Sequence, residues 1–248
     1  MNSISKEDII YQDDYIVILN KPSGMLTHPS WIDKDNAINA MAELRDYLGQ
    51  WVYTVHRLDR PTSGVLIFGL SSEIANKLAN AFASRETEKT YLALARGYTK
   101  EYGLINHPLK DLWDKMTDKE KSIDSPAREA ITEYWRLAIT ELNIPVRPHP
   151  TSRYSLVKVI PHTGRSRQIR RHFKHIFHHL IGDHQHGDGF HNRMLSENFG
   201  LNRLMLHAWK LKITHPITGK QITFEAPIPE DFKNLLQKIG INPFSIKT

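Results

Sequence analysis

The sequence predicts an α/β (α+β) fold, in which helices flank a mixed but mainly antiparallel central sheet. In the first half of the chain, apolar β-branched runs alternate with segments of helical spacing, whereas strand-like runs dominate the second half. The 248 residues are enough to bury one large core, and no repeat, homopolymer run or Gly/Ser linker interrupts them. We therefore expect one domain that spans residues 1–248.

The first half of the chain contains strands and helices in alternation. The apolar run at 15–19 predicts a strand, which ends at the turn-forming segment 20–24. The following elements are a helix begun by Asp35 or Asn36 and ended by Gly49, strands at 51–55 and 65–70, a helix begun by Ser71 or Ser72, and a strand at 89–95.

The second half is richer in strands and ends in a helix that begins at Pro229. Two segments lack a periodic pattern, the charged 110–128 and the proline-rich 143–152. We expect surface loops there, either simple connections or loops that grip a partner. The predicted strands are 130–137, 154–160, 204–214 and 221–225, the last two joined by a hairpin-type turn at 216–219.

The composition excludes several classes of protein. Without cysteine, the chain can form neither a disulfide framework nor a cysteine-ligated zinc site. No apolar run approaches the roughly 20 residues of a membrane span, and the first ten residues do not resemble a signal peptide, so we expect a cytoplasmic protein without a membrane partner. The 33 Lys and Arg against 27 Asp and Glu give a net charge of +6, which favours an anionic partner such as nucleic acid.

Motifs for the common cofactors are also missing. The sequence has no GKS or GKT phosphate loop, no Gly-x-Gly-x-x-Gly after a strand, no Gly-x-Ser-x-Gly and no His-Glu-x-x-His. We therefore expect no cofactor and no bound nucleotide. The His-rich segment 172–191 offers a metal site as a weaker alternative, because His175 and His179 would lie one turn apart on a helix. Its basic neighbours would repel a cation, and we expect no metal.

The helix predicted after Gly164 has one apolar and one basic face. Because no acid interrupts the basic face, we expect it to contact phosphate, although a solvated face is the alternative. The apolar positions are Ile169, Phe173, Ile176 and Leu180, and the basic positions, about half a turn away, are Arg167, Arg171, Lys174 and His178.

The polar segment 56–64 holds one carboxylate between two arginines. Asp59 is flanked by Arg57 and Arg60, and Gly64 permits a sharp turn into the next strand. A structural bridge between arginine and aspartate explains these residues by itself. The alternative is a carboxylate that a cation keeps ionised, able to act as nucleophile or base on an electrophilic ring or sugar.

This segment, His56-Arg-Leu-Asp-x-x-Thr-Ser-Gly64, resembles the signature loop of the RluA-type pseudouridine synthases. The resemblance implies the pseudouridine synthase fold with a central active-site cleft, isomerisation of uridine to pseudouridine in RNA, and no cofactor. Further segments resemble the family's other motifs, in family order: Asp13-Asp14-x-Ile-Val-x-x-Asn-Lys-Pro-Ser-Gly24, Lys89-x-Tyr91-x-Ala93 through Gly97, Thr163-Gly-Arg-Ser-Arg-Gln-Ile-Arg170, and Arg203-Leu-x-Leu-His-Ala208 with Thr214-His-Pro216.

The resemblance assigns roles to individual residues. It implies that Asp59 is the catalytic carboxylate and that Arg165 orients Asp59 and keeps it ionised. Tyr91 matches a pocket tyrosine that stacks on the uracil and relays a proton, with a core strand tyrosine as the alternative. Arg57 would fill the gap left by the flipped nucleotide. The other expected RNA-binding residues are Arg167, Arg170, Arg171 and Lys174.

The end of the third motif narrows the expected substrate. The segments 168–173, 181–183 and 187–192 are similar to a branch of the family that modifies uridine 65 in the T stem of tRNA. We therefore expect a monomer that acts on tRNA through a single catalytic domain, with no S4-like domain. A ribosomal RNA substrate and a non-catalytic RNA-binding protein are the alternatives. The family usually has His at the position of Arg167, a difference that bears on RNA contact or helix packing rather than on catalysis.

Overall fold

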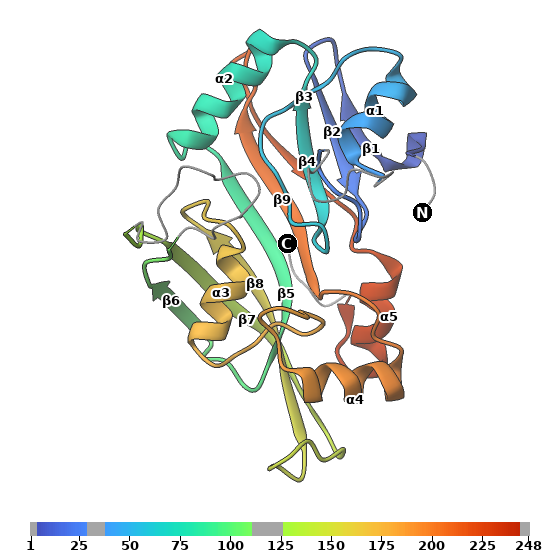
Figure 1. The fold of residues 1–248 in the computed structure, drawn as a ribbon, viewed down its shortest axis with the longest axis vertical. Coiled ribbons are helices and arrows are strands. Elements are labelled where there is room, and N and C mark those ends of the chain that lie inside the picture. The colour runs from blue at the N-terminus through green and yellow to red at the C-terminus, as the bar shows by residue number, and fades with distance from the viewer. Residues whose placement is uncertain (1–3, 29–37, 111–125, 244–248) are drawn as a thin grey trace. The chain divides into compact units, whose positions relative to one another are not determined.

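The computed structural model describes residues 4–28, 38–110 and 126–243. The chain forms two compact units (Figure 1). The first comprises Met1–Lys89, Lys110–Pro126 and Ala208–Pro227, and the second comprises Thr90–Leu109, Ala127–His207 and Ile228–Thr248. Because each unit combines segments that are distant in the sequence, each depends on long-range packing.

The first unit is built on an antiparallel sheet. Its elements are the 3-10 helix η1 (Lys6–Asp8), the strands β1 (Ile9–Gln12), β2 (Ile16–Lys21), β3 (Tyr53–Thr54), β4 (Ser63–Gly69), β9 (Leu206–Thr214) and β10 (Gln221–Glu225), and the helices α1 (Ala40–Leu48) and α2 (Ser72–Ala83). β2 pairs with β1 and β4, β3 with β4, and β10 with β9, all antiparallel. The last pair confirms the hairpin predicted at 216–219.

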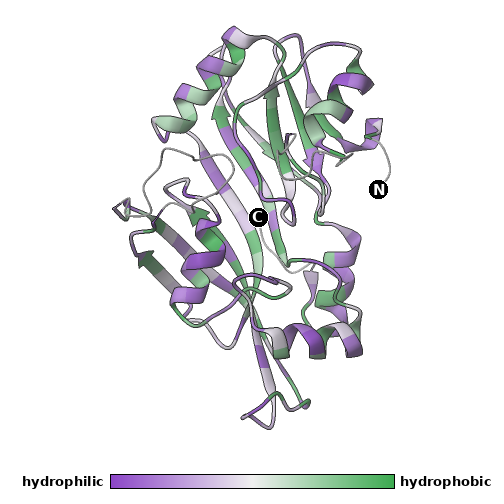
Figure 2. Cartoon of the chain, viewed as in Figure 1, coloured by the Kyte–Doolittle hydropathy of each residue, from purple (hydrophilic) through white to green (hydrophobic). Residues whose placement is uncertain are grey.

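Strands β2 and β4 form the centre of this unit. Residues 16–19 of β2 and all of β4 are buried, so these strands are covered on both faces. Figure 2 shows both strands as largely hydrophobic. Ile18 and Ile67 lie opposite each other and share a core with Ile74 and Leu78 of α2. The ends of these strands therefore give the adjoining loops a rigid base.

The helices of the first unit begin at side-chain caps. Ser71, one of the two predicted caps, accepts a hydrogen bond from the backbone N–H of Ile74 at 3.2 Å and begins α2. α1 begins at Asn39, whose side chain accepts from the N–H of Ala42 at 3.0 Å. The caps predicted for α1, Asp35 and Asn36, lie outside the described residues.

The second unit contains a second run of antiparallel strands. Its elements are β5 (Glu88–Arg96), β6 (Tyr102–Asn106), β7 (Ile131–Leu142), β8 (Ser152–Pro161), α3 (Gln168–His175), α4 (Gly189–Phe199) and α5 (Glu230–Lys238). β8 pairs with β5 and β7, and β7 also pairs with β6. α3 packs on these strands through Ile169 and Phe173, and the Phe173 ring lies 5.4 Å from that of Tyr134. The predicted α/β class with mainly antiparallel pairing is confirmed.

Several elements differ from the sequence prediction. β7 and β8 are longer than predicted because they pair up to Leu142 and Ser152, which leaves 143–151 as the connection between them. β1, β6 and α4 were not predicted. For α4 the reason is that buried His191 and Asn192 occupy its inner face beside Met194 and Leu195, which disrupts the apolar pattern. None of the helices in the described part of the chain is long and apolar enough to cross a membrane.

Two glycines of the first unit give a matched test of backbone packing. Both have positive φ, but a Cβ at Gly64 would lie 2.1 Å from the carbonyl oxygen of Ala208, whereas a Cβ at Gly49 would meet nothing within 4 Å. We expect Gly49→Ala to lower the free energy of unfolding by about 1–2 kcal/mol through strain alone. Gly64→Ala should lower it by about 3–5 kcal/mol, because overpacking adds to the strain. Urea unfolding measures both, and equal losses would contradict the packing argument.

Candidate active site

The loop that carries Asp59 is hydrogen-bonded to the loop that follows β2. The Thr27 hydroxyl accepts from the backbone N–H of Leu58 at 3.2 Å and lies 3.1 Å from its carbonyl oxygen. Two residues later, the N–H of Gly24 donates to the carbonyl of Arg60 at 2.8 Å, and Arg60 Nε donates to the carbonyl of Gly24 at 3.0 Å. Asp59 is therefore held between two anchored neighbours.

A buried lysine reinforces this connection. The Lys21 side chain is fully buried at the end of β2. Its Nζ donates to the carbonyl oxygens of Pro22 and Met25, both at 2.8 Å, and to that of Arg60 at 3.3 Å. A buried ammonium requires such acceptors, so the charge draws both loops toward one point. Lys21 lies within the first of the motifs, in the segment Asn20-Lys-Pro-Ser-Gly24, but no role of its side chain was predicted from the sequence.

Asp59 itself is half-buried, and Arg57 is exposed. The Asp59 carbonyl accepts from the N–H of Thr62 at 2.9 Å, which closes a tight turn within the loop. Asp59 is the first residue of this turn, and Thr62 and Ser63, which end it and begin β4, are buried. This arrangement can present a carboxylate to a substrate from a fixed backbone.

His56 anchors the start of the same loop. Its ring stacks on that of Phe82 from α2 at 4.5 Å between centroids, and its Nε2 accepts from the N–H of Ile67 at 3.4 Å. Burial, together with the nearby charge of Lys89, lowers the pKa of His56 to about 3. The ring therefore stays neutral, which an accepting Nε2 requires.

Asp13 and His215, which belong to the first and last of the motifs, form a structural pair in the first unit. Asp13 Oδ2 lies 2.9 Å from His215 Nε2, and its Oδ1 accepts from the N–H groups of Tyr15 and Ile16, both at 2.8 Å. Burial opposes ionisation of Asp13, but these hydrogen bonds outweigh it and hold its pKa below the usual value. The pair thus fixes the start of β2.

In the second unit, Tyr91 lies on β5 opposite Val159 of β8. It is half-buried and packs against the apolar core of the unit. This position is compatible with both interpretations of Tyr91, the pocket tyrosine and the core tyrosine, because one part of the ring is packed and another is accessible.

Arg165 lies in the turn before α3, and Gln168 fixes that turn. Arg165 N donates to Gln168 Oε1 at 3.0 Å, and Arg165 Nε donates to the carbonyl of Glu129 at 3.0 Å. Gln168 also accepts from the Thr163 hydroxyl at 2.7 Å and donates to the carbonyl of Ile131 on β7 at 2.9 Å. The buried glutamine thus joins the turn to the sheet and sets the position of Arg165.

The helix α3 is shorter than the sequence predicted, which changes its basic face. Arg167 precedes the helix with φ of 54°, and Phe177 has φ of 60° and follows its end. His178 and Leu180 therefore lie beyond the helix, where His178 Nδ1 contacts the carbonyl oxygen of Arg96 at 2.8 Å. Of the basic face, only Arg171 and Lys174 lie on the helix.

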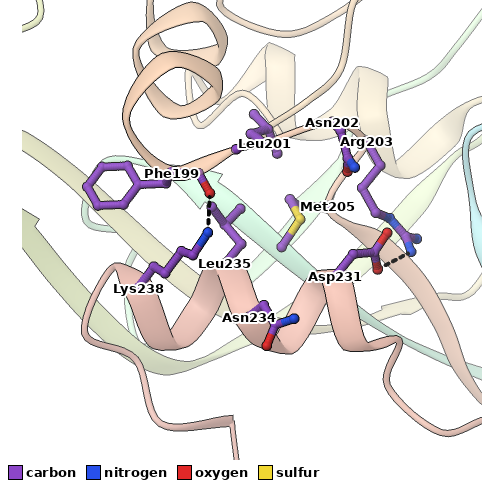
Figure 3. Close-up of a pocket in the computed structure, with 10 residues that line it drawn as sticks. Phe199, Leu201, Asn202, Arg203, Met205, Asp231, Asn234, Leu235 and Lys238 are labelled. Atoms are coloured by element: carbon purple, nitrogen blue, oxygen red, sulfur yellow. Dashed lines mark hydrogen bonds and ion pairs between the residues drawn. The ribbon is translucent and has the colours of Figure 1, made fainter.

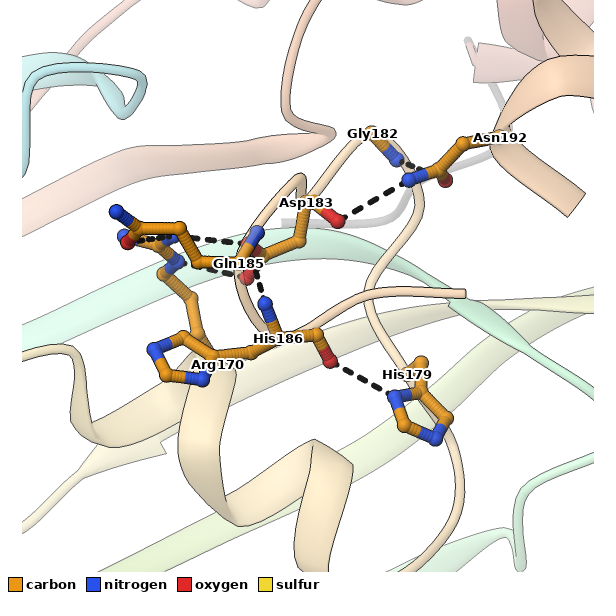
Figure 4. Close-up of polar contacts among 7 residues, drawn as sticks. All are labelled: Arg170, His179, Gly182, Asp183, Gln185, His186 and Asn192. Atoms are coloured by element: carbon orange, nitrogen blue, oxygen red, sulfur yellow. Dashed lines mark hydrogen bonds and ion pairs between the residues drawn. The ribbon is translucent and has the colours of Figure 1, made fainter. Parts of the chain in front are cut away.

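The predicted position of Arg170 on the RNA-binding surface is wrong. Its side chain is 4% exposed and is bound to Asp183, with Nε 2.7 Å from Oδ2 and Nη2 2.8 Å from Oδ1 (Figure 4). On α3, position 170 lies at the edge of the apolar face, about 60° from Phe173, and its burial is made possible by the ion pair with buried Asp183. Arg170 is thus a buried partner for Asp183.

Asp183 organises the loop after this ion pair. Its Oδ1 also accepts from the N–H groups of Gln185 at 2.9 Å and His186 at 3.0 Å, and its carbonyl accepts from Asn192 Nδ2 at 3.1 Å (Figure 4). Burial opposes ionisation of Asp183, but the Arg170 guanidinium and the N–H groups outweigh it and keep its pKa below the usual value.

The geometry behind the alternative metal site is also wrong. α3 ends at His175, so His179 is not one helical turn away from it. His175 instead stacks on His107 at 3.6 Å between ring centroids, and His179 Nδ1 contacts the carbonyl oxygen of His186 at 2.7 Å. Among the residues that the structure describes, no group of three or more His, Asp or Glu is placed to hold a metal ion.

A small cavity of about 170 Å³ lies between the end of α4 and α5 (Figure 3). The charged groups in its wall have partners within the protein. Arg203 Nη1 lies 3.1 Å from Asp231 Oδ1, and Lys238 Nζ donates to the carbonyl of Phe199 at 3.1 Å. These contacts attach α5 to the chain after α4, which favours a structural role for this part of the unit.

The predicted site residues are thus divided between the two units. Asp59 and Arg57 belong to the first unit. The second holds Tyr91, Arg165, Arg167, Arg170, Arg171 and Lys174. The pairing of Arg165 with Asp59 and the central cleft remain predictions, and so do the catalytic roles.

Comparisons with known proteins give the relationships of the chain. The family model for RNA pseudouridylate synthase matches residues 15–175. The chain is 50% identical over 229 residues to a tRNA pseudouridine synthase C from Pasteurella multocida, which covers 92% of this chain and 94% of that protein. It is 47% identical over 233 residues to a tRNA pseudouridine synthase C from Vibrio cholerae, which covers 94% of this chain and 96% of that protein.

Two solved structures share the fold. Human RNA Pseudouridylate Synthase Domain Containing 1 matches with a TM-score of 0.68 and 24% identity, covering 92% of this chain and 87% of that one. Human RNA Pseudouridylate Synthase Domain Containing 4 matches with a TM-score of 0.69 and 23% identity, covering 93% of this chain and 92% of that one.

The buried ion pair gives a prediction for stability. Asp183→Asn leaves the Arg170 charge buried without its carboxylate, so we expect the free energy of unfolding to fall by about 3–5 kcal/mol at pH 7. Glu73→Gln removes the exposed pair with Lys77 and should leave the free energy of unfolding nearly unchanged. Because the Asp183 pKa is lowered, its contribution is present above 3.8, its usual value, and is lost as the pH falls through the folded value. Urea unfolding measures this loss. Between pH 7 and 3 the free energy of unfolding should fall more in the wild type than in Asp183→Asn, and an equal fall in both proteins would contradict the prediction.

Proposed function

The chain belongs to the RNA pseudouridylate synthase family, and from this premise we propose that it converts uridine 65 in the T stem of tRNA to pseudouridine, with Asp59 as the catalytic carboxylate. It is an RNA pseudouridine synthase. The tRNA substrate is supported by the names of the bacterial relatives. Uridine 65 is supported by the segments at 168–173, 181–183 and 187–192.

The reaction requires a reactive carboxylate and an enclosed base. The C–N glycosidic bond breaks, the uracil rotates, and it rejoins the ribose through carbon, so atoms are rearranged without an electron carrier. The uridine must leave the helical stack, and water must be excluded from the detached base. A carboxylate near C1′, C2′ or C6 can then act as nucleophile or base.

The observation that carries the proposal is the attachment of the Asp59 loop. Leu58 and Arg60 are held by Thr27 and Gly24, so the residue between them has little freedom. Because this backbone is already ordered, only the side-chain torsions of Asp59 need to be fixed when its carboxylate meets the reacting atoms. In our proposal, Arg57 projects from the same loop and fills the space that the flipped nucleotide leaves.

Arg165 and Tyr91 complete the proposed site from the second unit. Glu129 and Gln168 hold the Nε and the backbone of Arg165, and in our proposal its Nη groups are the donors for Asp59. Such a pair keeps a carboxylate ionised in a dry pocket, where burial alone would protonate it. Tyr91 would stack on the uracil and move the proton released from C5. Pairing of Arg165 with Asp59 requires both units to contribute to one site, so we also propose that the two units act as one catalytic domain.

The RNA backbone is proposed to bind at the start and along the outer side of α3. Lys174 is exposed and Arg171 and Arg167 are half-buried, so their charges can approach phosphate. Arg170 would act only indirectly, by holding Asp183. We also propose that the enzyme is cytoplasmic and works as a monomer.

Replacing the proposed catalytic carboxylate tests the chemistry. We expect Asp59→Asn to reduce pseudouridine formation in tRNA by at least about a thousandfold, because the amide is neither a nucleophile nor a base. RNA affinity and the melting temperature should stay close to those of the wild type. Carbodiimide treatment followed by primer extension on total RNA measures the product and its position. Asp46→Asn, an exposed aspartate on α1, is the matched control.

Full activity of Asp59→Asn would refute its catalytic role. Product in ribosomal RNA alone would refute the tRNA substrate, and bound RNA without pseudouridine in the wild type would support the non-catalytic alternative.

Replacing the proposed phosphate contacts tests RNA binding. Arg171→Ala and Lys174→Ala should each weaken tRNA binding and reduce the slope of log K against log [salt] by about 0.7–0.9, the value expected for one lost phosphate contact. Lys100→Ala removes an exposed lysine of the second unit away from α3 and should leave the slope unchanged. Filter binding between 50 and 300 mM salt measures this slope. Unchanged slopes in both α3 variants would show that their charges are only solvated.

A further inference from the structure

Two phenylalanines in the second unit are exposed to an unusual extent. Phe177, after α3, is 75% exposed, and Phe190, in the first turn of α4, is 70% exposed. No other large apolar side chain in the described residues is as exposed as either of them. Exposed aromatic rings commonly belong to a contact surface.

The backbone of Phe177 is strained. Its φ of 60° is a left-handed conformation, which is rare for a bulky side chain because the Cβ approaches the carbonyl oxygen. Glycine or asparagine would adopt it at lower cost. A strained, exposed aromatic residue contributes little to packing, so its presence points to a function outside the folded core.

One arginine connects the two phenylalanines. The Arg96 guanidinium donates through Nη2 to the carbonyl of Phe177 at 3.0 Å, and through Nη1 it pairs with Asp188. Asp188 is the N-cap of α4, and its Oδ1 accepts from the backbone N–H of Phe190 at 3.0 Å. A single guanidinium thus fixes the backbone positions from which both rings project.

Each phenylalanine also has a cation three residues away. Lys174 precedes Phe177, whose N–H donates to the Lys174 carbonyl at 3.0 Å, and Arg193 follows Phe190 on α4. Both cations are exposed. Within the part of the chain that the structure describes, neither is paired with a carboxylate. Aromatic faces beside cations are the combination that binds unpaired nucleotides, because the rings stack on bases while the cations approach phosphates.

We propose that Phe177 and Phe190 form an aromatic platform that stacks on unpaired bases of the RNA substrate, flanked by Lys174 and Arg193. This inference rests on the proposed function, since it requires an RNA partner. It adds a binding surface to the basic residues of α3 and leaves the catalytic carboxylate and its partners unchanged. Stacking accepts any base, so the platform would contribute affinity without reading the sequence.

The test compares variants that keep or remove the ring. Phe177→Leu and Phe190→Leu should each weaken binding of an unmodified tRNA transcript by about 5- to 100-fold, the range for loss of one stacked base, whereas Phe177→Tyr and Phe190→Tyr should bind like the wild type. Leu104→Ala, which shortens an exposed apolar side chain on β6, is the control and should have no effect. Equal binding by the leucine and tyrosine variants would overturn the proposal.

Phe177→Asn separates function from folding. Because asparagine tolerates the left-handed conformation, this variant should raise Tm by about 2–4 °C, the shift expected for relief of one strained residue in a chain of this size, while it weakens tRNA binding. A fall in Tm would show that Phe177 is a structural residue and would overturn its assignment.

Two further measurements separate this proposal from its alternatives. Sedimentation of the wild type and of Phe177→Leu/Phe190→Leu shows whether the platform joins two copies of the chain, and a dimer that only the wild type forms would overturn the proposal. Pseudouridine formation by saturating amounts of the leucine variants should match the wild type, because only affinity is lowered. If the wild type binds tRNA but forms no pseudouridine, the proposed function fails while the platform is still tested by binding.

Discussion

The buried ion pair between Arg170 and Asp183 is the contact on which the outer surface of the second unit depends. It joins α3 to the loop that leads to α4, and the same carboxylate binds the N–H groups of Gln185 and His186. Burying two charges is costly, and only the bidentate geometry and the added hydrogen bonds compensate for it. The main effect of the pair is therefore to fix the conformation of the loop. This loop leads to Asp188, the cap of α4.

In the first unit a single buried charge, that of Lys21, fixes the conformation of two loops. Lys21 is buried beneath the loops at 22–25 and 58–62 and binds carbonyl groups in both. Because an ammonium has three donors and no acceptor, it can join several carbonyl groups that apolar packing would leave unsatisfied. In both units a buried cation therefore organises a loop, and in both cases that loop carries or adjoins residues that we propose contact the substrate.

The sequence was most informative where motifs or local rules determine the structure. The order of the motifs identified the family. The start of α2 was correctly predicted at Ser71 or Ser72, because capping depends on nearby residues. The lengths of α3 and β7 depend on distant partners. After α3, the chain turns at Phe177 and the N–H of Ile181 donates to the carbonyl of Leu94 on β5. This long-range contact, which no local pattern reveals, is incompatible with a longer helix. The burial of Arg170 depends on its ion pair with Asp183, which lies 13 residues away, so helical phase alone did not predict it.

The net charge of +6 is also less informative than the positions of the charges. Lys21 and Arg170 are buried and already bound to carbonyl or carboxylate groups, so they add little to the field that RNA meets. At physiological ionic strength, charges are screened beyond about 8 Å, and attraction to RNA therefore depends on cations near the contact. In the proposed platform Lys174 and Arg193 are such cations, since each is exposed and lies three residues from an exposed ring. Electrostatic attraction and stacking can then act on the same nucleotides, which neither net charge nor apolar surface area would predict alone.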